Sequence, residues 1–399
     1  MTIPDPRVLL EEKFGGGADP VRVCAPGRVN LIGEHIDYHN LAVLPMALRR
    51  SIRVAFRPRV DRRIRAVSSG GYGVCEFDWT AELKPAGAGD WENYLRAAAR
   101  AVSRKWEAGR GVDAAIVSDL PPAAGLSSSS ALIVAFTLSL LRANGYAPTF
   151  EELMEVLPEG EQFVGTRGGG MDHAASLESR EGCALLIEFD PLAVRAVPVP
   201  GDWAFLVAHS LTVAEKSGAV RQQYNARRAA GATALARLGF ASYRAAIEGR
   251  SPAEIEDLAA RALTDADERA GFLHVAGEAL RVRAAVGAME RGDAAAFGRL
   301  LLASHASLRD RLRVSCPALD RLVEAAMESG ALGARLTGAG FGGCAVVFCR
   351  SSDLASVRAG LIQRYYAESA HFNEDMHLIH AEPGPGALHM KDLNAAPHT

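Results

Sequence analysis

Lysine is scarce in this sequence of 399 residues: it supplies only five of the 44 basic side chains, and arginine supplies the rest. None of the five lysines follows a glycine. A Walker-type phosphate loop requires Gly-Lys-Ser or Gly-Lys-Thr, because its lysine contacts the nucleotide phosphates. The sequence therefore excludes that class of nucleotide-binding protein, and any use of ATP must depend on a different loop.

Cysteine, net charge and long apolar runs are also limited. The six cysteines are scattered without a Cys-x-x-Cys pair, which indicates reduced core residues and neither a disulfide framework nor a zinc site. A net charge of -3 argues against a broad electrostatic grip on nucleic acid or an anionic membrane. No run approaches the roughly 18 apolar residues of a membrane span, and the N-terminus is acidic where a signal peptide would be basic. We therefore expect a cytoplasmic protein without nucleic-acid or membrane partners.

The length predicts two or three domains, at roughly 100 to 200 residues each. Strand-like segments cluster early in the chain without regular strand-helix alternation, which favours an α+β fold over a doubly wound sheet. A proline-rich stretch at residues 191–203 predicts a boundary that divides the chain into residues 1–195 and 196–399. Beyond it, residues 217–329 predict four or five helices. The expected strands are residues 21–25, 43–56, 63–67, 112–120, 204–210, 333–337, 344–349 and 376–382, and the clearest expected helices are 91–106, 128–144 and 354–369.

The densest polar signal lies in residues 25–48, between apolar flanks. Five polar side chains occur there in close succession: Arg28, Asn30, Glu34, His35 and Asp37. Burying so many polar groups costs several kcal/mol unless each has a partner, so a bound polar ligand is a natural explanation. A solvated turn formed by Asp37 and Tyr38 is the alternative.

A second signal is the sequence GLSSSSAL, which follows an expected strand and opens an apolar helix. Its hydroxyls and free backbone N–H groups would lie at a helix N-terminus, where the positive end of the helix dipole favours a phosphate. Such a loop needs no lysine. Capping of the helix by one serine is the simpler alternative, although four consecutive serines exceed what a cap requires.

The third segment is rich in glycine and is flanked by two carboxylates, Glu161 and Asp172. One carboxylate near phosphates can hold a divalent cation, and another can accept a proton from an attacking hydroxyl. Alternatively, Asp172 merely caps the helix that is expected to follow it.

A fourth segment has the glycine spacing of a dinucleotide-binding loop at Gly338, Gly340 and Gly343. An apolar β-type segment follows it where a dinucleotide fold would have a helix, so that fold is excluded. The chain also lacks the His-Arg-Asp and Asp-Phe-Gly tripeptides of protein kinases. The segment therefore predicts a glycine turn between two strands, in which backbone can approach a ligand or another part of the chain closely.

Together these segments resemble the GHMP small-molecule kinases, and within them the group of galactokinases and N-acetylgalactosamine kinases. GRVNLIGEHIDY resembles the sugar-binding signature of that group, GLSSSSAL its phosphate loop, GGGMD its catalytic-aspartate motif and LTGAGFGGC its third motif. WENY and SHASLRDRLRVSCPALD are similar as well. Four motifs in the family's order are far more specific than any one of them.

The resemblance implies a two-domain α+β fold in which ATP and a sugar meet in the cleft between the domains. The implied reaction transfers the γ-phosphoryl group of ATP to the anomeric hydroxyl of galactose, with Mg2+ present. Arg28 and Asp172 would flank that hydroxyl as the catalytic residues, and a monomer or weak dimer is expected. The other implied roles are sugar binding by Glu34, His35, Asp37, Gly170 and Tyr224, ATP binding by Gly125, Leu126, Ser127, Ser128, Ser129 and Ser130, and metal binding by Ser129 and Glu161.

Several positions leave the identity of the sugar open. Features similar to N-acetylgalactosamine kinases are Ile36, Ser130, the glycines at 168–170 and the sequence LIEFDPL, whereas YNARR resembles galactokinases. The departures from the common pattern are His173 for glutamine, His39 and Asn40 for Asn-Gly, and Ala123 and Ala124 for loop glycines. The alternatives are therefore a kinase for N-acetylgalactosamine or a related hexose, and a sugar sensor of the same family. The complete serine run favours catalysis over sensing.

Overall fold

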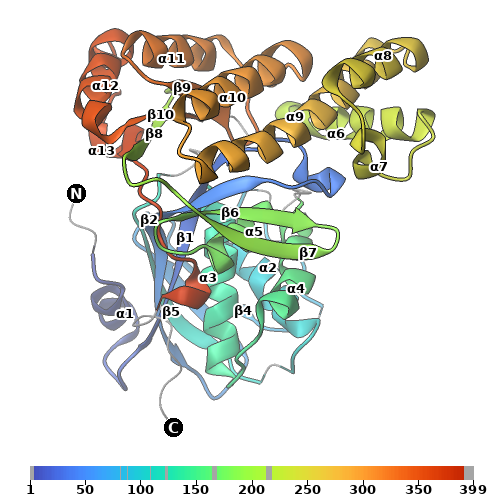
Figure 1. Ribbon diagram of the computed structural model, residues 1–399. Helices are drawn as coiled ribbons and strands as arrows, with labels where there is room; N and C mark the ends of the chain where they lie inside the picture. Colours follow the sequence, from blue (N-terminus) through green and yellow to red (C-terminus); the bar gives the residue numbers. More distant parts are fainter. Residues whose placement is uncertain are drawn as a thin grey trace.

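The computed structural model describes residues 4–80, 82–87, 89–107, 109–121, 125–163, 169–212 and 218–390, without the side chains of residues 161–162 and 218–221. Figure 1 shows two halves, a lower one built on a large sheet with helices and an upper, mostly helical one with a smaller sheet. The expected α+β fold is therefore confirmed.

The first half is built on a five-stranded sheet in the order β1-β2-β5-β3-β4. Its strands pair antiparallel, except that β3 and β5 run parallel. The first strand extends well beyond its expected end at residue 25, so Arg28 and Asn30 lie on a strand. The bounds are β1 (Val21–Ile32), β2 (Leu44–Pro58), β3 (Arg63–Ser68), β4 (Val74–Asp78) and β5 (Val112–Ser118).

Alternate residues of β2 face two different cores, because side chains on a strand alternate between faces. Val54 and Phe56 belong to the large core, whereas Ala55 packs with Leu10 of α1 (Pro6–Phe14) on the other face. The expected helix at residues 128–144 is confirmed as α3 (Ser128–Ala143), which contacts β1, β2 and three other helices and is therefore buried nearly all round. Those helices are α2 (Glu92–Ser103), α4 (Phe150–Phe163) and α5 (Met171–Glu178).

The second half contains a four-stranded antiparallel sheet in the order β11-β8-β10-β9. All four strands were expected from the sequence: β8 (Trp203–His209), β9 (Gly333–Thr337), β10 (Cys344–Arg350) and β11 (Leu378–His380). The expected helix at residues 354–369 begins as α12 (Leu354–Leu361) and continues as a π-helical segment (Ile362–Tyr366), after which α13 (Glu374–His377) leads into β11.

The helical region is more divided than the sequence predicts. Four or five helices were expected between residues 217 and 329, and the described part of the chain has six. The additional one is α7, whose five residues are too few to produce a helical period in the sequence. The helices are α6 (Gly218–Arg237), α7 (Tyr243–Ile247), α8 (Pro252–Ala262), α9 (Ala266–Glu290), α10 (Ala294–Ala306) and α11 (Pro317–Glu328).

Two segments connect the halves. The hairpin of β6 (Cys183–Phe189) and β7 (Leu192–Pro198) pairs with the first half through a bridge between Val43 and Ile187, and β7 contacts α9. The last described residues return to the first half, where Pro383 pairs with Leu48. The expected boundary after residue 195 falls within β7, and the division of the chain there stays a prediction.

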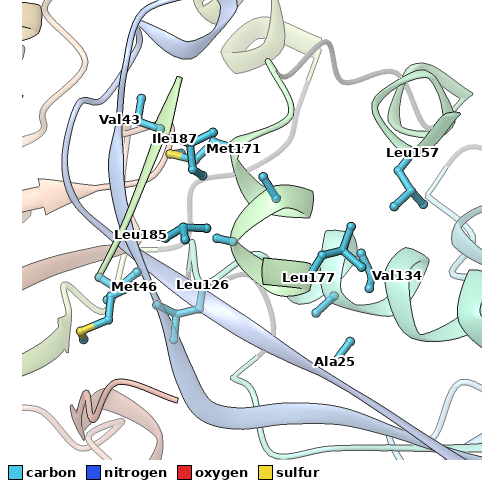
Figure 2. Packing of buried hydrophobic residues seen from close by; sticks show 14 of the residues in the cluster. Ala25, Val43, Met46, Leu126, Val134, Leu157, Met171, Leu177, Leu185 and Ile187 are labelled. Atoms are coloured by element: carbon cyan, nitrogen blue, oxygen red, sulfur yellow. The ribbon is translucent and has the colours of Figure 1, made fainter. Parts of the chain in front are cut away.

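Helix α5 packs against a continuous apolar core. Figure 2 shows part of this cluster, with Met171 and Leu177 of α5 together with Leu185 and Ile187 of β6. Apolar burial on these sides fixes the position of α5, and Asp172 follows directly after the buried Met171.

Candidate active site

The polar residues of the first motif are buried, as a ligand site requires. Strand β1 ends at Ile32, and the chain then turns through Gly33 and His35, which have φ angles of 107° and 62°. Only 3% of Glu34, 5% of His35 and 9% of Asp37 are exposed. The alternative of a solvated turn is therefore wrong, because these groups are removed from water and find protein partners.

Arg28 and Asp172 form the centre of the site. The guanidinium of Arg28 donates from Nε to Asp172 Oδ1 at 2.8 Å, pairs with the same oxygen from a terminal nitrogen at 2.7 Å, and donates to the carbonyl of Gly125 at 2.6 Å. The Asp172 side chain is 25% exposed, so one side of the carboxylate is open to a ligand. The arginine thus joins the aspartate motif, residues 168–172, to the serine loop, residues 125–130.

Asp172 is not a helix cap. It lies in the first turn of α5, but Gly170 occupies the cap position with φ of 101°, and no side chain accepts a cap hydrogen bond there. Burial favours the neutral acid, but Arg28 and the Ser127 hydroxyl outweigh it and lower the pKa of Asp172. The carboxylate is therefore ionised at neutral pH.

The serine loop begins α3 without capping it. Ser127 precedes the helix in a left-handed conformation, with φ of 56°, and its side chain makes no cap hydrogen bond. Its hydroxyl instead donates to Oδ2 of Asp172, and the Ser130 hydroxyl lies 3.4 Å from the same oxygen. The capping alternative is wrong, and the N–H groups of the first turn have no cap side chain to compete with a phosphate.

Asp37 lies close enough to Asp172 to sense its charge. The N–H of Gly169 donates to Asp37 Oδ2 at 2.9 Å, and a Cβ on Gly169 would lie 2.5 Å from the Asp37 carbonyl carbon, so this close approach requires glycine. Burial, and secondly the negative charge of Asp172, raise the pKa of Asp37 to about 6. Gly169 and Gly170 thus bring the sugar signature next to Asp172.

His35 is held as a neutral imidazole. Its Nε2 lies 3.1 Å from the carbonyl of Ala339 and therefore carries the proton, so Nδ1 accepts from the Tyr38 hydroxyl at 2.9 Å. Burial lowers the pKa of His35 to about 3. The Tyr224 ring lies 5.3 Å from the His35 ring, so α6 reaches the same site as the first motif.

The segment from Gly338 to Gly343 is the expected glycine turn between β9 and β10, and it contacts both the first motif and the loop at Gly125. The N–H of Gly338 donates to the Glu34 carboxylate, and a Cβ on Gly338 would lie 3.4 Å from the carbonyl oxygen of Gly125. With the contact from Ala339 to His35, this turn joins the sugar signature to the serine loop.

Glu34 lies in a buried network that sequence reasoning missed. Its carboxylate accepts from Asn30 and, at 3.0 Å, from Arg335 of β9, whose guanidinium also donates to two carbonyls of β1. Arg335 is fully buried. The sequence of β9 alone gives no signal for this role, because Arg335 is one charged residue in a short apolar strand. Sugar binding by Glu34 stays a prediction.

The expected metal residues are only partly described. Ser129 lies in the first turn of α3, whereas the side chain of Glu161 on α4 falls outside the description, as do Ala123 and Ala124. No group of three or more His, Cys, Asp or Glu arranged to hold a metal occurs among the described residues. Mg2+ usually has only one or two carboxylate ligands and substrate phosphates, so magnesium binding stays a prediction.

The described helices include none that is both long and apolar enough to cross a bilayer. All six cysteines lie among the described residues, and none of them forms a disulfide. A cytoplasmic location and a monomer or weak dimer stay predictions.

Comparison with known proteins identifies the class. The model for the N-terminal domain of GHMP kinases matches residues 93–180, and the model for the C-terminal domain matches residues 285–368. The mevalonate kinase of Methanococcus jannaschii shares this fold, with a TM-score of 0.62 at 18% identity over 92% of this chain and all of that one. The fold is thus that of the GHMP kinases.

Closer relatives narrow the class. The galactokinase galactose-binding signature matches residues 9–58. Galactokinase from Roseiflexus sp. (strain RS-1) is 38% identical over 90% of this chain and 91% of its own, and galactokinase from Homo sapiens is 36% identical over 93% of each. The crystal structure of Lactococcus lactis galactokinase complexed with galactose has a TM-score of 0.86 at 28% identity, covering 95% of this chain and 97% of that one. The chain belongs to the galactokinase family.

Proposed function

We propose that this chain transfers the γ-phosphoryl group of ATP to the anomeric hydroxyl of D-galactose, producing galactose 1-phosphate and ADP. The observation that carries the proposal is the double contact of Arg28, which binds both Asp172 and the Gly125 carbonyl. Through it the aspartate, the serine loop and the galactose-binding signature converge at one point.

Asp172 is the base in the proposed reaction. An anomeric hydroxyl is a poor nucleophile until its proton begins to leave. Oδ2 of Asp172 is the oxygen that does not pair with Arg28; it accepts from Ser127 and lies 3.4 Å from the Ser130 hydroxyl, and it would take that proton in the proposed reaction. As the proton moves to Oδ2, the sugar oxygen forms a bond to the γ-phosphorus, and the bond from this phosphorus to the β-γ bridging oxygen breaks. ADP leaves with the electron pair, and Arg28 balances the charge near the reacting oxygen.

The N-terminus of α3 binds the phosphates in this proposal. The N–H groups of its first turn, the helix dipole and the hydroxyls of Ser128 and Ser129 favour negative charge, whereas Ser127 and Ser130, whose hydroxyls donate to Asp172, are proposed to bind through the backbone. Mg2+ bound with the ATP would supply further charge neutralisation, and Ser129 and Glu161 are the residues proposed to hold it. Phosphoryl transfer depends largely on alignment and neutralisation, so this loop and Asp172 act together.

Asp37, His35, Tyr224 and Gly170 bind the sugar hydroxyls in the proposal. One carboxylate oxygen of Asp37, Oδ2, accepts a hydrogen bond from the N–H of Gly169. A buried site built to bond a particular hydroxyl leaves its own groups unpaired when that hydroxyl is absent or inverted. Selection for the galacto configuration follows from this arrangement.

A panel of sugars tests the function. Purified protein is assayed for ADP release with ATP, Mg2+ and either galactose, N-acetylgalactosamine or glucose, against a sugar-free control. We expect turnover with galactose and very little with glucose. Preferred turnover of N-acetylgalactosamine would favour the alternative kinase, and sugar binding without turnover of any sugar would favour a sensor. Absence of both binding and turnover would overturn the proposal.

A further inference from the structure

The turn that carries Glu34 and His35 is held by helix α9 of the other half. The N–H of Gly33 donates to Glu278 Oε1 at 3.0 Å, and Nε2 of His274 lies 3.0 Å from the carbonyl oxygen of Glu34. His274 and Glu278 are four residues apart and therefore share one face of the helix. Both side chains are fully buried.

These two contacts hold a backbone conformation that is unfavourable for the chain on its own. His35 has a φ of 62°, which is unfavourable for a residue with a side chain, and such a conformation persists only when its surroundings hold it. Gly33 and Glu34 immediately precede it, and α9 contacts one polar backbone group of each. Because both groups are buried, losing either partner leaves a polar group without water or protein to replace it.

A second set of contacts fixes the side chains that hold the turn. Glu278 accepts from Ser304 at 2.6 Å and from Arg281 at 2.7 Å, and Nδ1 of His274 lies 2.9 Å from the Ser307 hydroxyl. With Ser307 donating to Nδ1, the proton of His274 resides on Nε2, facing the Glu34 carbonyl. Neither Glu278 nor His274 is among the residues that the resemblance implies.

The charge of Glu278 is retained despite its burial. Burial favours the neutral acid, but the positive charges nearby, Arg281 first, lower the pKa of Glu278 to about 2. Burial lowers the pKa of His274 to about 4, so the imidazole is neutral. The bond from Gly33 is therefore charge-assisted, which makes it stronger than a bond between neutral groups.

We propose that Glu278 and His274 are positioning residues for the sugar site, which hold the turn at residues 33–35 so that His35 and Asp37 face the sugar. This inference rests on the proposed function. Neither residue contacts the serine loop or Asp172 through a hydrogen bond given by the structure, so their effect falls on the sugar and not on ATP.

The test uses His274→Ala, His274→Gln and a matched control, Tyr366→Phe. His274→Ala removes the donor to the Glu34 carbonyl, whereas the side-chain amide of glutamine can replace the Nε2 proton. Tyr366→Phe also removes one buried donor to backbone carbonyls of the second half, those of His209 at 2.7 Å and His377 at 3.2 Å, neither of which belongs to the turn at residues 33–35. Calorimetry measures galactose and ATP affinity, kinetics give both KM values, and thermal melts give stability.

We expect His274→Ala to raise the Kd and KM of galactose about three- to tenfold, from the net value of one hydrogen bond, while those of ATP change less than about twofold. His274→Gln should recover most of the galactose affinity. Tyr366→Phe should lower the melting temperature comparably without changing galactose affinity.

Two results would overturn this inference and leave the proposed function intact. One is galactose affinity in His274→Ala no weaker than in Tyr366→Phe, and the other is an equal loss of galactose and ATP affinity without recovery in His274→Gln. Both presuppose that the wild-type protein binds and phosphorylates galactose. A wild-type protein that does neither would overturn the proposed function, and this inference with it.

Discussion

Replacement of Asp172 by asparagine separates the charge of this residue from its shape. The amide oxygen can still accept from Arg28, which now contacts Oδ1 at 2.8 Å, and the amide NH2 would face Ser127, whose hydroxyl can turn to accept. What the variant loses is the negative charge and the atom that takes the proton. The geometry of the site therefore survives while the proposed chemistry does not.

The expected loss follows from the role of a base. General-base catalysis contributes about 100- to 10,000-fold, which corresponds to about 2.7 to 5.4 kcal/mol of barrier at 1.36 kcal/mol for each factor of ten. Arg28 loses its counter-charge but keeps the Gly125 carbonyl and the amide oxygen as acceptors. The fold should therefore lose less than the ~3 to 5 kcal/mol expected when one partner of a buried pair is removed entirely.

The assay is kcat from coupled ADP release at saturating galactose and ATP, with ATP affinity and melting temperature as controls. We expect kcat to fall about 100- to 10,000-fold, with ATP affinity nearly unchanged. Because the folded protein lowers the pKa of Asp172, its ionised form stabilises the wild type above the unfolded value near 3.8, and this contribution is lost in acid. The wild type should therefore lose its advantage in melting temperature over Asp172→Asn as the pH falls. A variant with near wild-type kcat would refute the assignment of the base.

The remaining predictions concern the sugar and the metal. Asp37→Ala should lower kcat/KM for galactose far more than it lowers ATP affinity. It should also reduce the preference for galactose over glucose, which is measured by comparing kcat/KM for the two sugars. An unchanged preference would point to Tyr224 or His35 instead. Because burial and Asp172 raise the pKa of Asp37 to about 6, the wild type loses stability as the pH rises from about 4 through 6. Thermal melts should therefore show Asp37→Asn gaining more stability over the wild type at pH 7 than at pH 4, and an equal gain at both would contradict the raised pKa. Glu161→Gln should raise the Mg2+ concentration needed for half-maximal activity, and an unchanged magnesium dependence would exclude Glu161 as a ligand.

Much of the fold could be predicted because its periodic segments are long or strongly apolar. Strands β8, β9 and β10 are almost wholly buried, and α3 is buried on nearly every face, so each leaves an apolar run in the sequence. Helix α7 could not be predicted because five residues do not complete two turns. The extension of β1 was missed because Arg28 and Asn30 interrupt its apolar pattern, and Arg28 pairs with Asp172, 144 residues away in the chain.

The site was predictable only where its residues lie close in sequence. The serine loop and the segment from Glu34 to Asp37 are continuous, so their polar density is visible without a structure. Glu278, His274 and Arg335 are single polar residues among apolar ones, and nothing in α9 or β9 alone distinguishes them from a solvated face. Their role becomes visible only when residues 240 to 305 positions apart are brought together.

The return of the C-terminal segment to the first half has a consequence for synthesis on the ribosome. Gly384 donates to Ala47 at 2.9 Å and Gly386 to Ser179 at 2.8 Å, while His389 lies 2.7 Å from Glu178 at the end of α5. A Cβ on Gly386 would lie 2.3 Å from the Leu177 carbonyl oxygen, so the segment passes directly against this helix. The helix that presents Asp172 is therefore made early, but it receives its last packing partner only after residue 383 has been translated. A nascent chain stalled between residues 344 and 383 contains every motif of the site and still lacks the segment that packs against α5.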